Sequence, residues 1–189
     1  DKQLKYWLTQ LQTSRPAELL CDKPRPAALS GSADVRTLKL DGSLYVRLRE
    51  FCNARGVTLF VVLLAAFRAT HFRLTGQEDA TIGTANANRD RSELKDMIGF
   101  FVNMQCLRIM VNDDTFEQLV QQVQAVAVES LANQDVPFER IVSKLKKDRD
   151  LSRHPLIQLV FAVHSQQDIG KLTLEGVETE GLDEVATSR

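Results

Sequence analysis

Two side-chain amides on one predicted strand are the residues of this chain best placed for chemistry. Residues 99–109 read GFFVNMQCLRI, which is rich in aromatic and β-branched residues and predicts a central strand. Strand alternation places Asn103 and Gln105 on one face together with Phe101 and Leu107. A buried amide costs about 1–3 kcal/mol when it is unpaired. The two amides therefore either hydrogen-bond to neighbouring backbone or line a wet cavity.

The residue types that bind metals or form disulfides are scattered along the chain. They are Cys21, Cys52, Cys106, His71, His154 and His164. An odd number of distant cysteines argues against a disulfide framework and against a thiolate zinc site, so buried free thiols are favoured. No two histidines stand at a metal-binding helical interval. We assign no metal, and no nucleophile elbow, P-loop, dinucleotide fingerprint or HExxH motif is present.

The elements that must position the two amides follow from hydrophobic spacing and from capping residues. Helices are predicted over 3–13, between Gly42 and Gly56, between Thr58 and Gly76, after a cap at Asp114 or Thr115, and from Pro137 to Leu145. Strands are predicted over 35–40, 80–85, 99–109 and 156–163, with one or two edge strands within 172–182. This order predicts an α/β or α+β fold, a mixed β-sheet covered by helices.

Composition and charge exclude several classes of protein. The chain has 189 residues, and 24 Lys and Arg nearly balance 25 Asp and Glu, which argues against nucleic-acid or anionic-membrane partners. No apolar run approaches the ~20 residues of a membrane helix, and no secretory signal is visible. We therefore expect a cytoplasmic protein. Asp1 is not a Met, and the sequence stops abruptly at Arg189, so we expect a piece of a longer chain.

Three stretches resemble motifs of one enzyme family. Residues 98–108 (IGFFVNMQCLR) resemble the IGxFVNTQxxR motif of nonribosomal peptide synthetase condensation domains. Residues 133–139 (NQDVPFE) are similar to their HQDxPFE motif, and 149–156 (RDLSRHPL) to their RDxSRxPL motif. Three further segments fit the same family, namely Tyr6-Trp7, 16–20 and 81–89. Their sequences resemble those of fungal cyclosporin, enniatin and beauvericin synthetases. Ala85 stands where the family often has Pro, and Met104 where Thr is usual.

The resemblance implies a lobe of a larger catalytic domain. Condensation domains consist of two lobes resembling chloramphenicol acetyltransferase, set in a V around a tunnel, with a catalytic HHxxxDG motif in the first lobe. The present chain contains no His-His pair. Residues 1–189 are therefore expected to be the C-terminal lobe, without the N-terminal catalytic lobe and inactive alone. No cofactor is expected to bind directly, because phosphopantetheine arms of carrier domains deliver the substrates.

The resemblance also implies roles for individual residues. Asn103, with Gln105 behind it, is the candidate tunnel residue, which hydrogen-bonds reacting groups or fixes the backbone of the tunnel. Asn88 and Arg89 follow a strand and are candidates for the tunnel mouth.

Four further motif residues are expected to be structural. Asp150 and Arg153 are expected to form a charge-assisted pair that braces the turn before the Leu156 strand. Asp135, beside Pro137, is expected to cap a helix rather than to act as an acid.

The expected partners are the N-terminal lobe, the upstream and downstream peptidyl carrier domains, and a neighbouring adenylation domain. The expected reaction is formation of an amide or ester bond between two carrier-bound thioesters. The alternative from another class is a non-catalytic module that docks or scaffolds carrier domains. Epimerisation and terminal macrocyclising domains share the fold, although the FVN and NQDVPFE wording favours ordinary condensation.

Overall fold

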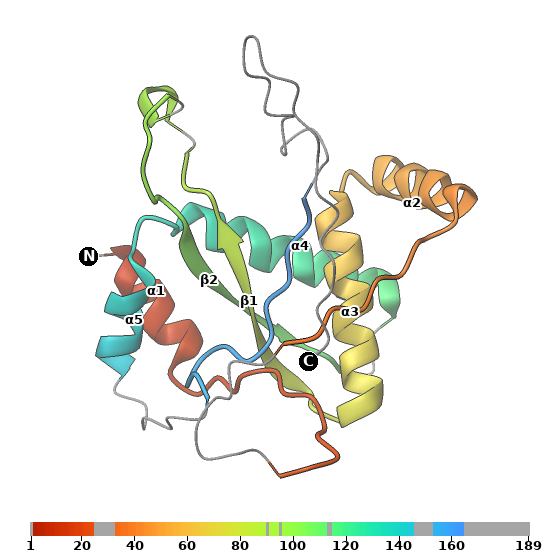
Figure 1. Cartoon of the computed structure of the whole chain (residues 1–189), viewed down its shortest axis with the longest axis horizontal. Coiled ribbons are helices and arrows are strands. Elements are labelled where there is room, and N and C mark those ends of the chain that lie inside the picture. The colour runs from red at the N-terminus through yellow and green to blue at the C-terminus, as the bar shows by residue number, and fades with distance from the viewer. Residues whose placement is uncertain are drawn as a thin grey trace.

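A computed structural model describes residues 2–24, 33–89, 91–94, 96–112, 115–145 and 153–164. These residues form five α-helices, two strands and one short 3-10 helix (Figure 1). In chain order they are α1 (Lys2–Leu11), α2 (Gly42–Arg55), α3 (Leu59–Thr75), β1 (Asp79–Asn86), the 3-10 helix Ser92–Leu94, β2 (Asn103–Met110), α4 (Phe116–Ala132) and α5 (Phe138–Leu145). All five predicted helices are present, close to their expected bounds.

Local capping explains where the helices begin and end. The Thr58 hydroxyl accepts a hydrogen bond from the backbone N–H of Val61 and starts α3. Gly56 and Gly76 follow α2 and α3 in the left-handed conformation, with φ of 62° and 70°, which glycine adopts without a Cβ penalty. At α4, Thr115 is the cap, and it forms a reciprocal capping box with Gln118.

The sheet is centred on β1. β1 pairs with β2 in antiparallel register from Asp79 opposite Met110 to Asn86 opposite Asn103. Two isolated parallel bridges join β1 to other segments, Thr81 to Pro16 and Gly83 to Val160. Figure 1 shows the blue 153–164 segment running beside β1. The two described strands are thus antiparallel, and the parallel bridges to β1 give the mixed pairing that the sequence predicts.

Three strand predictions change in the structure. Residues 35–40 are exposed and form no strand, because no segment among the described residues supplies the hydrogen-bond ladder. β2 starts at Asn103 rather than at 99, because its register with β1 ends at Asn86. The predicted strand 156–163 contributes one bridge, at Val160. The predicted edge strands in 172–182 lie outside the described residues.

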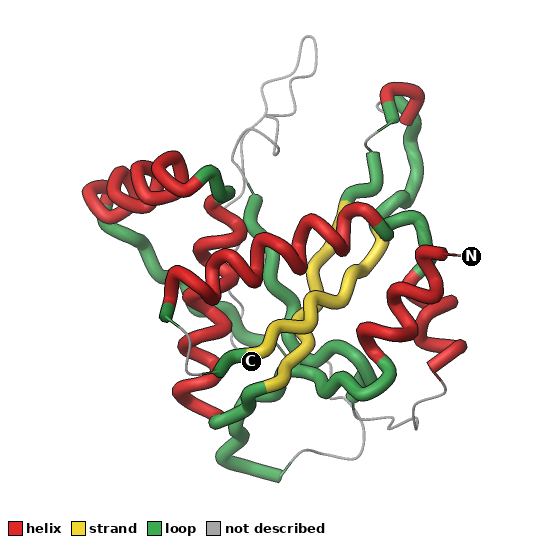
Figure 2. The backbone as a smooth tube through the Cα atoms, turned by 180° about the vertical axis from the view of Figure 1, so that it is seen from behind, coloured by secondary structure: helices red, strands yellow, loops and turns green. Residues whose placement is uncertain are grey.

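The strand pair separates two apolar clusters. One cluster packs Ile82 and Leu107 against α3 and α4, and the other packs Cys106 and Ile157 against α1 and α5. Figure 2, seen from behind, shows α4 lying across one face of the strands. Leu107 and Cys106 thus point to opposite faces, as strand alternation predicted. The face toward α3 and α4 is the one that carries Gln105.

In the described part of the chain, no single helix has both the length and the apolar composition to cross a membrane. Only α2 and α3 taken together, as a pair bent by 107°, reach that length and composition.

Candidate functional site

The turn at residues 133–138, here called the motif turn, is held by the side chain of Asn103. The Asn103 Nδ2 donates to the carbonyl oxygens of Gln134 and Val136, at 3.0 and 2.9 Å. Its Oδ1 accepts from the backbone N–H of Phe138 at 3.0 Å. One amide therefore satisfies two carbonyls of the turn and the first N–H of α5. Of the two alternatives for Asn103, its described contacts correspond to bonding with neighbouring backbone.

Helix α1 holds the same turn from another side. The indole Nε1 of Trp7 donates to the Asn133 carbonyl at 2.8 Å. Gln3 donates through Nε2 to the Asp135 carboxylate at 2.9 Å, and its Oε1 accepts from the Asp135 N–H at 3.2 Å. Asp135 thus binds Gln3 of α1, and Asn103 is the residue that accepts the first N–H of α5. The described contacts of Asp135 are thus with α1 and not with the first N–H of α5, and its structural role stays a prediction.

Two further segments complete the bracing. From the end of β1, Asn86 donates through Nδ2 to the Gln134 side chain and accepts the N–H of Asn88 at 3.0 Å. Asn88 adopts a positive φ of 52°, which asparagine tolerates better than most residues. The ring of His154 stacks on Phe138 at 5.2 Å between centroids. Residues from all three sequence motifs, and from 81–89, therefore meet at the motif turn.

Arg89 organises the loop between β1 and β2 instead of extending into open space. Its guanidinium donates to the carbonyls of Leu94, Met97 and Gly99, the last at 3.0 Å. It also lies over the Phe101 ring, 4.5 Å from the centroid. The Arg89 guanidinium is thus occupied by the backbone of its own loop. A role at the tunnel mouth remains a prediction.

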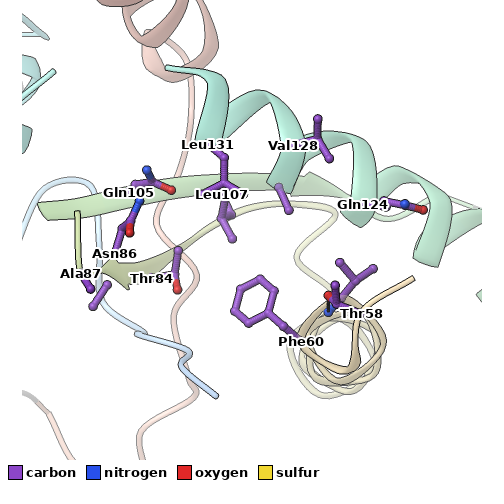
Figure 3. Close-up of a pocket in the computed structure, with 13 residues that line it drawn as sticks. Thr58, Phe60, Thr84, Asn86, Ala87, Gln105, Leu107, Gln124, Val128 and Leu131 are labelled. Carbon is purple, nitrogen blue, oxygen red and sulfur yellow. Dashed lines mark hydrogen bonds between the residues drawn. The ribbon is translucent and has the colours of Figure 1, made fainter. Parts of the chain in front are cut away.

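A pocket of about 310 Å³ opens between the strand pair, the start of α3 and α4 (Figure 3). Its wall is mainly apolar and includes Phe60, Leu107 and Val128. Thr84 and Gln105 face each other across β1 and β2 at one end of this wall. Gln105, expected to lie behind Asn103 in the tunnel, is therefore a pocket residue.

Gln105 is buried with part of its hydrogen-bonding capacity unused. The side chain is 3% exposed, and its Oε1 accepts from the Ser130 hydroxyl at 2.8 Å. Its Nε2 has no partner within the described residues. An unpaired buried amide donor is costly. Among the described residues that line the pocket, Gln105 is therefore the one with a buried side-chain atom left unpaired.

Sequence reasoning missed the role of the motif arginine, Arg108. Its guanidinium forms two hydrogen bonds to the Asp79 carboxylate, at 2.8 and 2.7 Å, and a third to the Gln10 carbonyl at 2.8 Å. The hydrogen bond to Asp79 raises the pKa of Arg108 further above its ordinary value, against the opposing effect of burial. The planar guanidinium suits this two-point contact. Arg108 therefore ties β2 to β1 and to the end of α1. The sequence signal that could have indicated this role is its position as the last residue of the 98–108 motif.

Arg153 forms an ion pair within the described residues. It pairs with Glu18 at 3.0 Å, while Asp150 lies outside the described residues, so the expected pair between them stays a prediction. Pro137 immediately precedes α5, and its carbonyl accepts the N–H of Arg140 at 3.0 Å. Within the described ranges, no cluster of three or more His, Cys, Asp or Glu residues is placed to hold a metal ion.

A family model named Condensation domain matches residues 1–186. The chain belongs to the condensation-domain family. It is 69% identical over 188 residues to the nonribosomal peptide synthetase TES of Alternaria alternata, covering 99% of this chain and 4% of that protein. It is 58% identical to the cyclosporin synthetase simA of Tolypocladium inflatum, covering 100% of this chain and 1% of that protein. The resemblance to fungal synthetases is therefore confirmed.

The fold is also that of the family. A solved four-domain nonribosomal peptide synthetase, holo-AB3403 bound to AMP and glycine, superposes with a TM-score of 0.81 at 28% identity, covering 85% of this chain and 12% of that chain. The fold is thus of the chloramphenicol acetyltransferase type, as expected. Condensation domains are an acyltransferase-type enzyme family, and this chain spans only a few per cent of its curated relatives.

Proposed function

We propose that residues 1–189 form the C-terminal lobe of a condensation domain, which joins two carrier-bound thioesters in concert with an N-terminal lobe carrying HHxxxDG. In this reaction the amine or hydroxyl of the acceptor attacks the carbonyl carbon of the donor thioester. A C–N or C–O bond forms and the C–S bond breaks. The proton lost by the attacking group balances the thiolate that leaves.

The observation that carries this proposal is the chemical character of the pocket wall. The described residues that line the pocket carry hydroxyl, amide and apolar side chains, and none of them is a carboxylate, imidazole, thiol or amine. Such a wall holds substrates but has no group that titrates near neutral pH to move a proton. The proton transfer is therefore assigned to the other lobe, and this lobe contributes binding and orientation.

The braced motif turn supports the same division of labour. Holding two tethered reactants in register is worth up to about 7–11 kcal/mol when the alignment is good. Alignment of that quality needs a wall that does not shift. The contacts from Asn103, Trp7 and Gln3 fix the turn at one end of β2. We therefore assign Asn103 the role of fixing the backbone of the tunnel wall.

The partners follow from this assignment. The upstream and downstream carrier domains deliver substrates on phosphopantetheine arms, an adenylation domain lies next to them, and no cofactor binds this lobe directly. The three cysteines are free thiols, which is typical of a reducing compartment and supports a cytoplasmic location.

The decisive experiment compares the 189-residue chain with the parent two-lobe domain, using carrier proteins loaded with donor and acceptor and mass spectrometry of the product. We expect product from the two-lobe domain and none from the 189-residue chain. Changing the second histidine of HHxxxDG to alanine in the two-lobe domain is the matched control, and it should also remove product. Turnover by the 189-residue chain would contradict the proposed dependence on the first lobe. An inactive two-lobe domain that still binds carriers would favour the docking-module alternative.

A further inference from the structure

The pocket between β1, β2, α3 and α4 combines two chemical surfaces. Its apolar side comes from three elements, with Phe60 on α3, Leu107 on β2, and Val128 and Leu131 on α4. Figure 3 shows Val128 on α4 above the strands and Phe60 below them. A space of about 310 Å³ is at the lower end of the range for small-molecule sites. It suits one residue-sized apolar group.

The polar side consists of Thr84 and Gln105. They are opposite each other in the β1–β2 register and both line the pocket. Thr84 is 9% exposed, and Gln105 keeps its Nε2 unpaired within the described ranges. By contrast, the neighbouring Asn86 uses both ends of its amide. A hydroxyl and an unpaired amide donor thus lie opposite each other at one end of an apolar pocket.

We propose that this pocket binds the apolar side chain of a carrier-bound aminoacyl or hydroxyacyl group, with Thr84 and Gln105 hydrogen-bonding a carbonyl of that group. An apolar side chain gains free energy from burial against the α3 and α4 wall. A carbonyl satisfies the Gln105 Nε2 donor, which is otherwise unpaired. A charged side chain is disfavoured, because the lining offers it no opposite charge. The pocket itself rests on the structure, and the identity of the occupant rests on the proposed function.

Binding to the full 189-residue chain tests the pocket without requiring catalysis. The probes are non-hydrolysable pantetheine amides of N-acetylleucine, N-acetylglycine and N-acetylglutamate, titrated by calorimetry. We expect the leucine probe to bind about tenfold or more tighter than the glycine probe, because apolar pockets discriminate by about that factor per small group. The glutamate probe should bind no tighter than glycine. Equal affinity for leucine and glycine would overturn the proposal.

Two matched tryptophan variants locate the binding site. Val128 and Ala125 are both exposed residues of α4, but only Val128 lines the pocket. Val128→Trp should narrow the pocket and reduce the leucine preference to less than twofold, while Ala125→Trp should keep it. Loss of the preference in both variants, or in neither, would contradict the assignment to this pocket.

Thr84 and Gln105 are tested as positioning residues. Thr84→Val keeps the shape and removes the hydroxyl, and Gln105→Leu removes the amide. Each should weaken all three probes about fivefold or more without changing their order, and Thr84→Ser should restore binding. Thermal unfolding of each variant checks the fold. Unchanged affinity in both folded variants would remove the polar half of the proposal.

An experiment with the two-lobe domain shows whether the acyl group in the pocket comes from the donor carrier or from the acceptor carrier. Leucyl and glycyl groups are loaded on the donor carrier in one arm and on the acceptor carrier in the other. Val128→Trp should lower kcat/KM for the leucyl-loaded carrier about tenfold in one arm only. That arm identifies the carrier whose acyl group occupies the pocket. If the wild-type two-lobe domain forms no bond in either arm, the proposed function fails, while the binding titrations still decide the pocket.

Discussion

The side-chain oxygen of Asn103 in β2 accepts the backbone N–H of Phe138, the first residue of α5, at 3.0 Å. The two residues are 35 positions apart in the sequence, and the same amide donates to two carbonyls of the intervening turn. A strand residue therefore supplies the cap of a distant helix. This contact joins two of the three stretches that identify the family.

Replacement of Asn103 tests how much the motif turn depends on this amide. In Asn103→Ala, two carbonyls and one N–H lose their partner in a half-buried site, so we expect a loss of about 2 kcal/mol in the free energy of unfolding. Urea unfolding of the 189-residue chain measures it. Asn53→Ala, at an exposed position of α2, is the matched control and should cost less than about 0.5 kcal/mol. Equal effects of the two changes would contradict the bracing role.

In the two-lobe domain, Asn103→Ala should also lower condensation, since a loosened turn would misplace the proposed tunnel wall. Asn103→Asp keeps the acceptor for Phe138 and loses the donor, so it should fall between wild type and Asn103→Ala in both measurements. Unchanged turnover in a destabilised Asn103→Ala domain would confine this residue to a purely structural role.

The sequence predicts features that depend on neighbouring residues, and it misses contacts between segments that are distant in the chain. The caps at Thr58 and Thr115 and the stops at Gly56 and Gly76 follow from contacts within four residues, and all are present. Residues 35–40 have the apolar pattern of a strand, but a strand also needs a partner. That pairing depends on distant segments, which spacing alone does not provide.

The candidate site shows the same limit. Alternation placed Asn103 and Gln105 on one face, but it did not indicate that Asn103 bonds to the motif turn while Gln105 lines a pocket. The residues that brace the turn from α1, Gln3 and Trp7, lie more than 120 positions away from it. Arg89 hydrogen-bonds to its own loop. The sequence does not predict this contact, because it depends on three carbonyl groups that converge only in the folded chain.

Arg68 gives a second prediction, because this cation is completely buried in α3. It donates to the carbonyls of Ile109, Gln77 and Glu78, and burial lowers its pKa to about 10. Arg68→Met would leave these carbonyls unpaired, so we expect a loss of about 3 kcal/mol in the free energy of unfolding, measured with urea. Arg73→Met, at an exposed position of the same helix, should change it by less than about 0.5 kcal/mol. Similar losses in the two variants would contradict the role of Arg68.

The third prediction concerns pH. Burial, followed by the Arg68 cation, lowers the pKa of His71 below 6.5, although the hydrogen bond to the Glu18 carbonyl opposes this shift. Burial also lowers the pKa of His154. In both cases the folded state favours the neutral ring. The Nδ1 of His71 lies 3.2 Å from the Arg68 guanidinium, and the Nδ1 of His154 accepts the N–H groups of Leu156 and Ile157.

The sign follows from proton uptake. Below pH 6.5 both rings bind protons more readily in the unfolded chain than in the folded chain. The two rings therefore lower the free energy of unfolding as the pH falls from 6.5 toward their lowered pKa values in the folded chain. Above pH 6.5 their stabilising contribution is fully present. Urea unfolding at a series of pH values between about 7.5 and 5.5 measures the slope. The double variant His71→Gln with His154→Asn should show a shallower slope than wild type, and an identical slope would contradict the assignment.

Gly83 provides the fourth prediction, because it lets the 153–164 segment approach β1. A Cβ added to Gly83 would lie 2.6 Å from Cγ2 and 3.0 Å from Cδ1 of Ile157. Ile157 is 8% exposed and belongs to the cluster between α1 and α5, so its side chain has little room to move. Gly83→Ala should therefore lower the free energy of unfolding by about 1–3 kcal/mol.

Glycine 42, the first residue of α2, is the matched control, because an added Cβ there meets nothing within 4 Å. Gly42→Ala should be neutral or slightly stabilising, since alanine restricts the unfolded chain more than glycine does. Chemical denaturation compares the two variants, and hydrogen exchange at the Gly83 and Phe161 amides reports the segment directly, because both bond across this contact. Faster exchange at these amides in Gly83→Ala is expected. Unchanged exchange, with no loss of stability, would show that the segment does not depend on the close approach at Gly83.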